Sequence, residues 1–93
     1  MDFHRSLEMS VSREEFFRLL PAAVGPFEAD GELARGTDGD RRWIIRLAAL
    51  PDLHLGSAVL PRHRVAITLD ACSNAEGEAF MARFHRGFLR GGG

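Results

Sequence analysis

The sequence predicts an α+β domain in which an antiparallel five-stranded sheet carries two helices on one face. Two observations support this prediction. Apolar residues alternate with other residues between positions 41 and 70, and a Ser-x-x-Glu sequence typical of a helix start occurs both before and after the strand-forming region. The resulting order of elements is strand, helix, four strands and helix. We expect a single domain over residues 1–90, followed by a glycine tail over residues 91–93.

The alternation defines three consecutive strands, over residues 41–50, 53–60 and 62–70, separated by Pro-Asp and Leu-Pro. Successive side chains of a strand point to opposite faces, so residues of one parity share a face of the sheet. The odd-numbered apolar positions are Trp43, Ile45, Leu47, Leu53, Leu55, Val59, Val65, Ile67 and Leu69. We therefore expect the odd-numbered face to form the core beneath the two helices.

The first strand is predicted over residues 2–11 and leads directly into a helix. Ser12 and Glu15 have the spacing of a capping box, in which each side chain accepts a hydrogen bond from the backbone N–H of the other residue. Pro21 removes one backbone donor, and we expect it to kink or split the helix just before its own position. The Gly25-Pro26 pair should end the helix.

A strand over residues 27–35 follows, and a turn rich in glycine and aspartate joins it to the next strand. A two-residue loop would set the apolar faces of the two strands against each other. A three-residue loop over residues 37–39 keeps those faces together. This loop places Leu33 opposite Trp43.

A second Ser-x-x-Glu sequence, from Ser73 to Glu76, starts a terminal helix over residues 74–89. The apolar stripe of this helix is formed by Phe80, Met81, Phe84, Phe88 and Leu89. The three glycines that follow are expected to stop the helix.

This order of elements resembles the helix-grip or TBP-like arrangement, in which an antiparallel sheet curves around a long C-terminal helix. START-type and birch-pollen-allergen-type ligand-binding proteins are larger members of that arrangement. The resemblance covers the whole chain and rests on element order alone, so it implies a fold and transfers no residue role.

Length and composition limit the class of protein. The chain has 93 residues, is 45% hydrophobic and carries a net charge of −1. These values indicate a globular domain and give no reason to expect nucleic acid or membrane as a partner. No apolar segment approaches the roughly 20 residues that span a bilayer, and we expect no signal peptide. Cys72 is the only cysteine and all twelve basic residues are Arg, from which we predict a cytoplasmic bacterial protein.

The sequence contains no recognisable catalytic, metal or cofactor motif. The four histidines, His4, His54, His63 and His85, lack the i, i+4 helical spacing of a zinc site. The paired glutamates lie in the first turns of the predicted helices, where the helix dipole favours acidic residues. We therefore expect a protein that is not an enzyme and that uses no cofactor.

The even-numbered face of the sheet is the most informative functional feature. If both helices cover the odd face, small and apolar residues are left uncovered with few charges among them. The predicted interaction surface comprises Ile44, Arg46, Ala48, Ala58, Arg64 and Ala66. We expect a protein-interaction module whose partner is a second copy of the chain or another protein. The alternative is a solvated sheet face that tolerates alanine.

Two other functions are also considered. A small apolar ligand would occupy a pocket between the sheet and the C-terminal helix, lined by Trp43, Phe80, Phe84 and Phe88. The terminal Gly-Gly is similar to that of the ubiquitin-like sulfur carriers, whose C-terminal Gly-Gly is adenylated and thiocarboxylated. Those proteins have a β-grasp fold that opens with a hairpin, whereas here a helix follows the first strand, which disfavours a carrier function.

Overall fold

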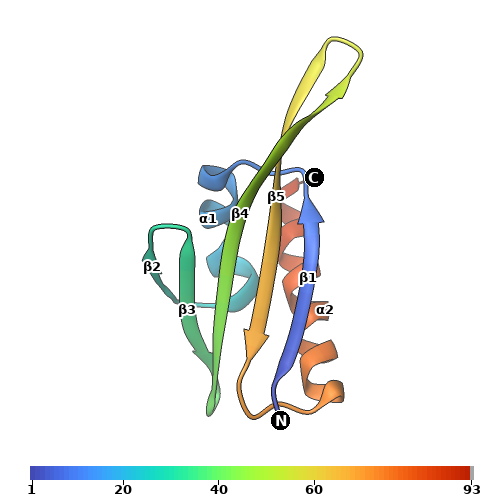
Figure 1. The fold of residues 1–93 in the computed structure, drawn as a ribbon. Helices are drawn as coiled ribbons and strands as arrows, with labels where there is room; N and C mark the ends of the chain where they lie inside the picture. The colour runs from blue at the N-terminus through green and yellow to red at the C-terminus, as the bar shows by residue number, and fades with distance from the viewer. Residues whose placement is uncertain (93) are drawn as a thin grey trace.

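The computed structural model describes residues 1–92, with side chains described through Phe88. Its strands and helices are β1 (Phe3–Met9), α1 (Arg13–Val24), β2 (Glu28–Asp30), β3 (Leu33–Asp38), β4 (Arg41–Leu55), β5 (Ala58–Leu69) and α2 (Asn74–Gly92). The strands form one antiparallel sheet in the order β1-β5-β4-β3-β2. Both helices lie on the same face of this sheet (Figure 1). The predicted α+β class, strand number and element order are confirmed.

Helix α1 begins with the predicted capping interaction and ends where predicted. The Ser12 hydroxyl accepts a hydrogen bond from the Glu15 N–H at 3.1 Å, and the Gly25 N–H, at a residue with φ 85°, donates to the Pro21 carbonyl. Helix α1 continues through Pro21, so of the two predicted outcomes, a kink or a split, the split does not occur. Pro21, which lacks a backbone N–H, lies at an exposed position of the helix. The neighbouring Leu20 is fully buried and holds this part of the helix against the core.

Residues 41–70 form two long strands rather than three. A tight turn at Gly56-Ser57 joins β4 to β5, so the separate strand predicted over residues 53–60 is wrong. The strand predicted over residues 27–35 is divided into β2 and β3 by a turn at Gly31-Glu32. Gly31 and Gly56 have φ values of 63° and 60°, which glycine adopts without steric cost. One predicted strand is absent and another is divided into two, so the number of strands is five, as predicted.

The register between β3 and β4 also differs from the prediction. A two-residue turn, Gly39-Asp40, joins these strands, and Gly36 rather than Leu33 lies opposite Trp43. The indole explains this register, because a Cβ atom on Gly36 would lie only 2.5 Å from the Trp43 ring. A larger residue at that place would push the indole out of the close-packed core. As a result Ala34, and not Leu33, is the β3 residue buried in the core.

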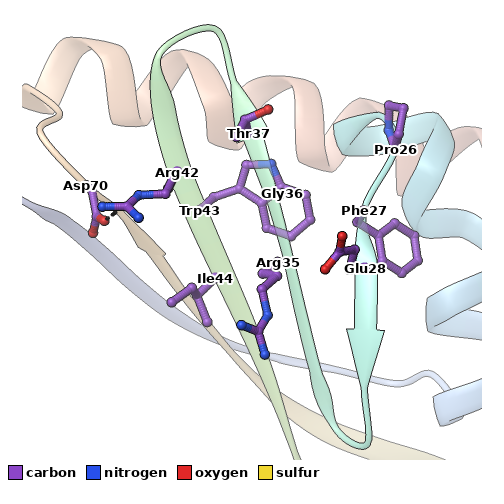
Figure 2. Close-up of a pocket in the computed structure, with 10 residues that line it drawn as sticks. All are labelled: Pro26, Phe27, Glu28, Arg35, Gly36, Thr37, Arg42, Trp43, Ile44 and Asp70. Atoms are coloured by element: carbon purple, nitrogen blue, oxygen red, sulfur yellow. Dashed lines mark ion pairs between the residues drawn. The ribbon is translucent and has the colours of Figure 1, made fainter.

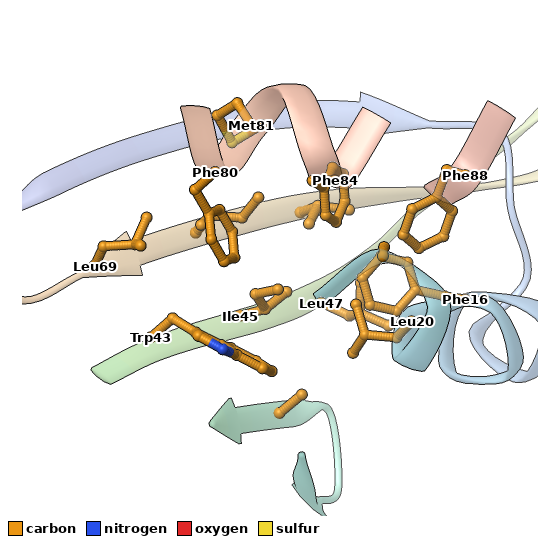
Figure 3. Packing of buried hydrophobic residues seen from close by; sticks show 14 of the residues in the cluster. Phe16, Leu20, Trp43, Ile45, Leu47, Leu69, Phe80, Met81, Phe84 and Phe88 are labelled. Carbon is orange, nitrogen blue, oxygen red and sulfur yellow. The ribbon is translucent and has the colours of Figure 1, made fainter. Parts of the chain in front are cut away.

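The odd-numbered face of β4 and β5 forms the core wherever the helices cover it, as predicted (Figure 3). The buried residues of these two strands are Trp43, Ile45, Leu47, Val65, Ile67 and Leu69. Helix α1 contributes Phe16 and Leu20, and helix α2 contributes Phe84 and Phe88. The Phe16 and Phe88 rings stack with their centroids 5.1 Å apart, which joins the two helices over the sheet.

The far end of the β4–β5 hairpin extends beyond both helices as a two-stranded arm, which we define as residues 50–62 (Figure 1). Pairing of β1 with β5 stops at His63, and pairing of β3 with β4 stops at Arg46. No further strand among residues 1–92 pairs with the arm. Leu55 and Val59 were predicted on the core face but are 58% and 54% exposed, because they lie in the arm.

Helix α2 begins with the second predicted capping box, which is complete in both directions. The Glu76 N–H donates to the Ser73 hydroxyl at 3.2 Å, and the Ser73 N–H donates to the Glu76 carboxylate at 3.0 Å. The helix continues to Gly92 instead of ending at Leu89. The carrier function considered for the terminal glycines also concerns Gly93, which lies outside the described residues.

Candidate functional site: the open sheet face

The face of the sheet opposite the helices is uncovered in the described part of the chain, and we call it the open face (Figure 1). Along β4 and β5 it presents even-numbered residues, with Arg46 opposite Ala66 and Ala48 opposite Arg64. Ile44 is the largest apolar side chain among these residues and is 41% exposed. Five of the six residues predicted for the interaction surface are therefore neighbours on the open face.

The sixth predicted residue, Ala58, lies away from the other five. It is in the arm, opposite Leu55 and next to the Gly56-Ser57 turn. Like the other five, it is exposed to solvent. The structure thus places the predicted surface partly on the sheet and partly on the arm.

Arginine side chains dominate the polar part of the open face. Three of them form ion pairs at 3.6 to 3.8 Å: Arg42 with Asp70, Arg35 with Asp30, and Arg62 with Glu8. Exposed pairs of this kind contribute about 0–1 kcal/mol each. No carboxylate among the described side chains lies within 4.0 Å of Arg46 or Arg64. These two central arginines therefore offer donors to a partner without first breaking a salt bridge.

A groove with a volume of about 660 Å³ hollows the sheet where β2, β3 and β4 meet (Figure 2). Its lining residues are Pro26, Phe27, Glu28, Arg35, Gly36, Thr37, Arg42, Trp43, Ile44 and Asp70. Charges of both signs surround it, from Arg35 and Arg42 on one hand and Glu28 and Asp70 on the other, while Ile44 adds an apolar wall. This composition suits a small molecule that is partly apolar and partly charged.

The groove was not predicted from the sequence, because the predicted register gave Arg35 the parity of the core face and placed Thr37 in the loop over residues 37–39. With Gly36 opposite Trp43, the odd residues of β3 instead share the open face with the even residues of β4. The sequence signal for this arrangement is Gly36, a glycine within β3, because the neighbouring strand β4 carries the bulky Trp43.

The four aromatic residues predicted to line a ligand pocket lie together in the core. Trp43, Phe80, Phe84 and Phe88 are at most 9% exposed. Ring centroids are 6.4 Å apart for Trp43 and Phe80, and 4.7 Å apart for Phe84 and Phe88. Of the four, Trp43 also lines the groove. Its Nε1 atom is buried and has no hydrogen-bond partner among the described residues.

Two carboxylates with a shifted pKa lie beside helix α2 rather than on the open face. Asp38 accepts hydrogen bonds from the Arg83 guanidinium at 2.5 and 3.3 Å, and this interaction lowers the pKa of Asp38. Hydrogen bonds from Ser73, followed by the charge of Arg41, lower the pKa of Glu76. Arg41 lies 2.5 Å from Glu76, so both carboxylates connect the β3–β4 turn to α2.

Within residues 1–92, no group of three or more His, Cys, Asp or Glu side chains is arranged to hold a metal ion. The same part of the chain has no helix with the length and apolar character of a membrane span. Cys72 is buried, and its thiol donates to the Ser73 carbonyl at 3.4 Å.

The chain matches no protein-family model, no curated protein and no solved structure. Fold and site together define a two-layer α+β domain with one uncovered sheet face. Functional inference for this domain therefore depends on the physical character of that face.

Proposed function

We propose that this chain is a non-enzymatic protein-interaction module that forms a homodimer through its open face. The observation that supports the proposal is the uncovered sheet, on which Ile44 is 41% exposed among the small residues Ala48 and Ala66. Small side chains make a flat surface, and an apolar area larger than a few hundred Å² on a folded protein usually marks a contact site. The single free cysteine, Cys72, is consistent with the cytoplasmic location that we propose.

Size-exclusion chromatography with light scattering, over a series of concentrations, tests this proposal. The wild-type chain should have the mass of a dimer. Ile44→Glu should weaken dimerisation at least about tenfold, because association would bury an unpaired carboxylate. The matched control is Ala82→Glu, at an exposed position of α2, which should leave the dimer unchanged. A strictly monomeric wild type, or a folded Ile44→Glu variant that dimerises normally, would contradict the proposal.

Binding of a small ligand is a second candidate function, and the groove beside Trp43 favours it. The groove volume of about 660 Å³ falls within the roughly 300–1,000 Å³ that is typical of ligand sites. Arg35 and Arg42 favour a small apolar molecule that carries an acidic group. The helix-grip arrangement, which the element order resembles, includes ligand binders and supports the same candidate.

Fluorescence of Trp43, the only tryptophan, reports on this groove. Titration with anilinonaphthalenesulfonate, an apolar anion, should change the Trp43 emission saturably. Arg42→Ala should weaken this binding about tenfold, since a hydrogen bond to a charged group is lost. Arg18→Ala, on the exposed side of α1, should have no effect. An emission that does not change, or changes without saturation, would count against a ligand site in the groove.

A further inference from the structure

The arm turns an apolar face to the same side as the open face. A β-bulge at Pro51-Asp52 shifts the pairing from Leu50–Arg62 to Leu53–Leu60, which adds one residue to β4 alone. β5 continues without interruption, so its even residues stay on the open side along the whole strand. Beyond the bulge, the odd residues of β4 lie on the same side as the even residues of β5. The face that results comprises Leu53, Leu55, Ala58 and Leu60.

This arm face has no cover among the described residues. Leu55 is 58% exposed and Leu60 is 37% exposed. Residues 53–60 contain no Asp, Glu, Lys or Arg. A two-stranded ribbon without a third strand or a packed helix is marginally stable in water, so an apolar arm of this kind gains from being covered.

The arm also enlarges the surface of the molecule. The chain measures 45 × 23 × 23 Å and has an accessible surface of 5848 Å². A compact monomer of this mass exposes about 5,400 Å², so the excess is roughly 450 Å². The two strands of the arm contribute to this excess because no further strand among residues 1–92 pairs with them.

We propose that the arm of each copy lies across the open face of a second copy, with the strands of the two copies running in opposite directions. This inference rests on the proposed homodimer and adds which surfaces meet. One chain carries an apolar ribbon and a flat apolar face on the same side of the same two strands. A two-fold axis near the bulge therefore brings each arm onto the face of the other copy.

In this arrangement the arm leucines cover Ala48 and Ala66 of the partner copy. The guanidinium of Arg46, which has no carboxylate within 4.0 Å among the described side chains, then faces backbone carbonyl groups of the Gly56-Ser57 turn in the other arm. The end of the arm, residues 53–60, carries no charged side chain and thus supplies acceptors for an arginine and apolar contact for its neighbours. The long stem of Arg46 adds further apolar area.

The area available supports a second copy as the occupant. With a strand spacing of about 4.8 Å and a rise of about 3.3 Å per residue, the open face covers roughly 500 Å² in projection, and face and arm together cover roughly 700 Å². A standard interface buries about 800 Å² per partner, so the arm brings the contact close to that size. Another protein would have to present both an apolar ribbon and a flat face at the same spacing, which a second copy does by symmetry.

Charge substitutions within the arm test this inference. Leu55→Glu and Leu60→Glu should each weaken dimerisation at least about tenfold in light-scattering and sedimentation measurements. The matched control is Val59→Glu. Val59 is 54% exposed in the same arm but has the opposite parity on β5, so this variant should dimerise normally. Circular dichroism should show an unchanged fold for all three, since each position is exposed.

The outcomes separate this inference from the proposed homodimer. If Ile44→Glu gives monomers while both leucine variants behave like Val59→Glu, the open face dimerises without the arm and the inference is wrong. If only the leucine variants give monomers, the arm binds elsewhere and the inference is also wrong. A monomeric wild type contradicts both proposals.

Cross-linking gives an independent measurement. In a Cys72→Ala background, a mixture of Leu55→Cys chains and Ala66→Cys chains should form a mixed disulfide dimer on mild oxidation. A mixture of Val59→Cys and Ala66→Cys chains should not, because Val59 lies on the other face of the arm. Equal yields from the two mixtures would overturn the inference.

Discussion

Gly36 is the residue at which β3 and the Trp43 indole come into contact. Its φ is not in the left-handed region, so glycine is needed here for space and not for backbone conformation. A Cβ atom would lie 2.5 Å and 2.8 Å from two atoms of the Trp43 ring. This contact places the even residues of β3 in the core and so determines which side chains line the groove.

Gly36→Ala should destabilise the chain by about 1–3 kcal/mol in urea denaturation, as overpacking does in other cores. In a Trp43→Phe background the same substitution should cost less, because the smaller ring has no counterpart of Cζ2, the atom nearest to the added Cβ. Gly39→Ala is the control: its cost arises from φ 65° with no neighbour within 4 Å, so it should be equal in both backgrounds. Equal costs for Gly36→Ala in both backgrounds would show that the indole does not set the register.

The ion pair between Asp38 and Arg83 is a second contact between single residues, and it connects β3 to α2. The Arg83 guanidinium donates to both carboxylate oxygens of Asp38 and lowers the pKa of that carboxyl. A pKa that is lower in the folded state than in the unfolded state stabilises the fold above the unfolded pKa. This stabilisation disappears as the pH falls through the lower, folded-state value.

Asp38→Asn should therefore reduce the free energy of unfolding at pH 6 to 7, and the difference from wild type should shrink below about pH 4. Asp40→Asn is the control, since no Arg or His nitrogen lies within 4.0 Å of the Asp40 carboxylate among the described side chains. Urea denaturation at a series of pH values measures both. A difference for Asp38→Asn that stays constant down to pH 2.5 would show that the ion pair does not produce it.

At the level of elements, helices α1 and α2 are in close contact where Gly87 faces Ala23. A Cβ atom on Gly87 would lie 2.4 Å from the Ala23 Cα and 2.9 Å from its backbone nitrogen. Backbone atoms cannot rotate away as a side chain can. The two helices therefore form one continuous layer over the sheet only because position 87 carries no side chain.

Gly87→Ala should destabilise the chain by about 1–3 kcal/mol, because the added Cβ overpacks the contact. This loss is expected even though alanine favours a helix by about 1 kcal/mol relative to glycine. Ala23→Gly in the same chain should not restore stability, because the Cα and nitrogen of residue 23 remain in place. Ala79→Gly, at an exposed position of α2, gives the propensity effect alone. A Gly87→Ala variant that is more stable than wild type in urea would contradict this packing.

The whole molecule combines a closed core with an open surface. Two helices cover one face of the sheet, and the other face is exposed together with an arm that extends past both helices (Figure 1). Of the large apolar side chains that are exposed, Ile44, Leu55, Val59 and Leu60 lie on the β4–β5 hairpin. This asymmetry is the reason why association, rather than chemistry within the chain, is the function that we propose.

Local sequence patterns predicted those features that depend on neighbouring residues. The Ser73–Glu76 capping box forms in both predicted directions, and Ser12 accepts the predicted hydrogen bond from the Glu15 N–H, because each interaction spans a single helical turn. Alternation identified the buried side of β4 and β5 and, with it, the exposed residues Ile44, Arg46 and Ala66 on the other side. Strand parity needs no knowledge of which strands pair.

The sequence by itself thus determined the element order, the two helix starts and the odd-numbered core. Only the tertiary structure decided the β3–β4 register, the groove and the direction of the arm. The register depends on Gly36 and Trp43, which meet only after their strands pair. The arm face depends on the bulge at Pro51-Asp52, where β4 contains one extra residue. Beyond the bulge the odd residues of β4, and no longer the even ones, lie on the open side, although the alternation of the sequence gives no sign of this change.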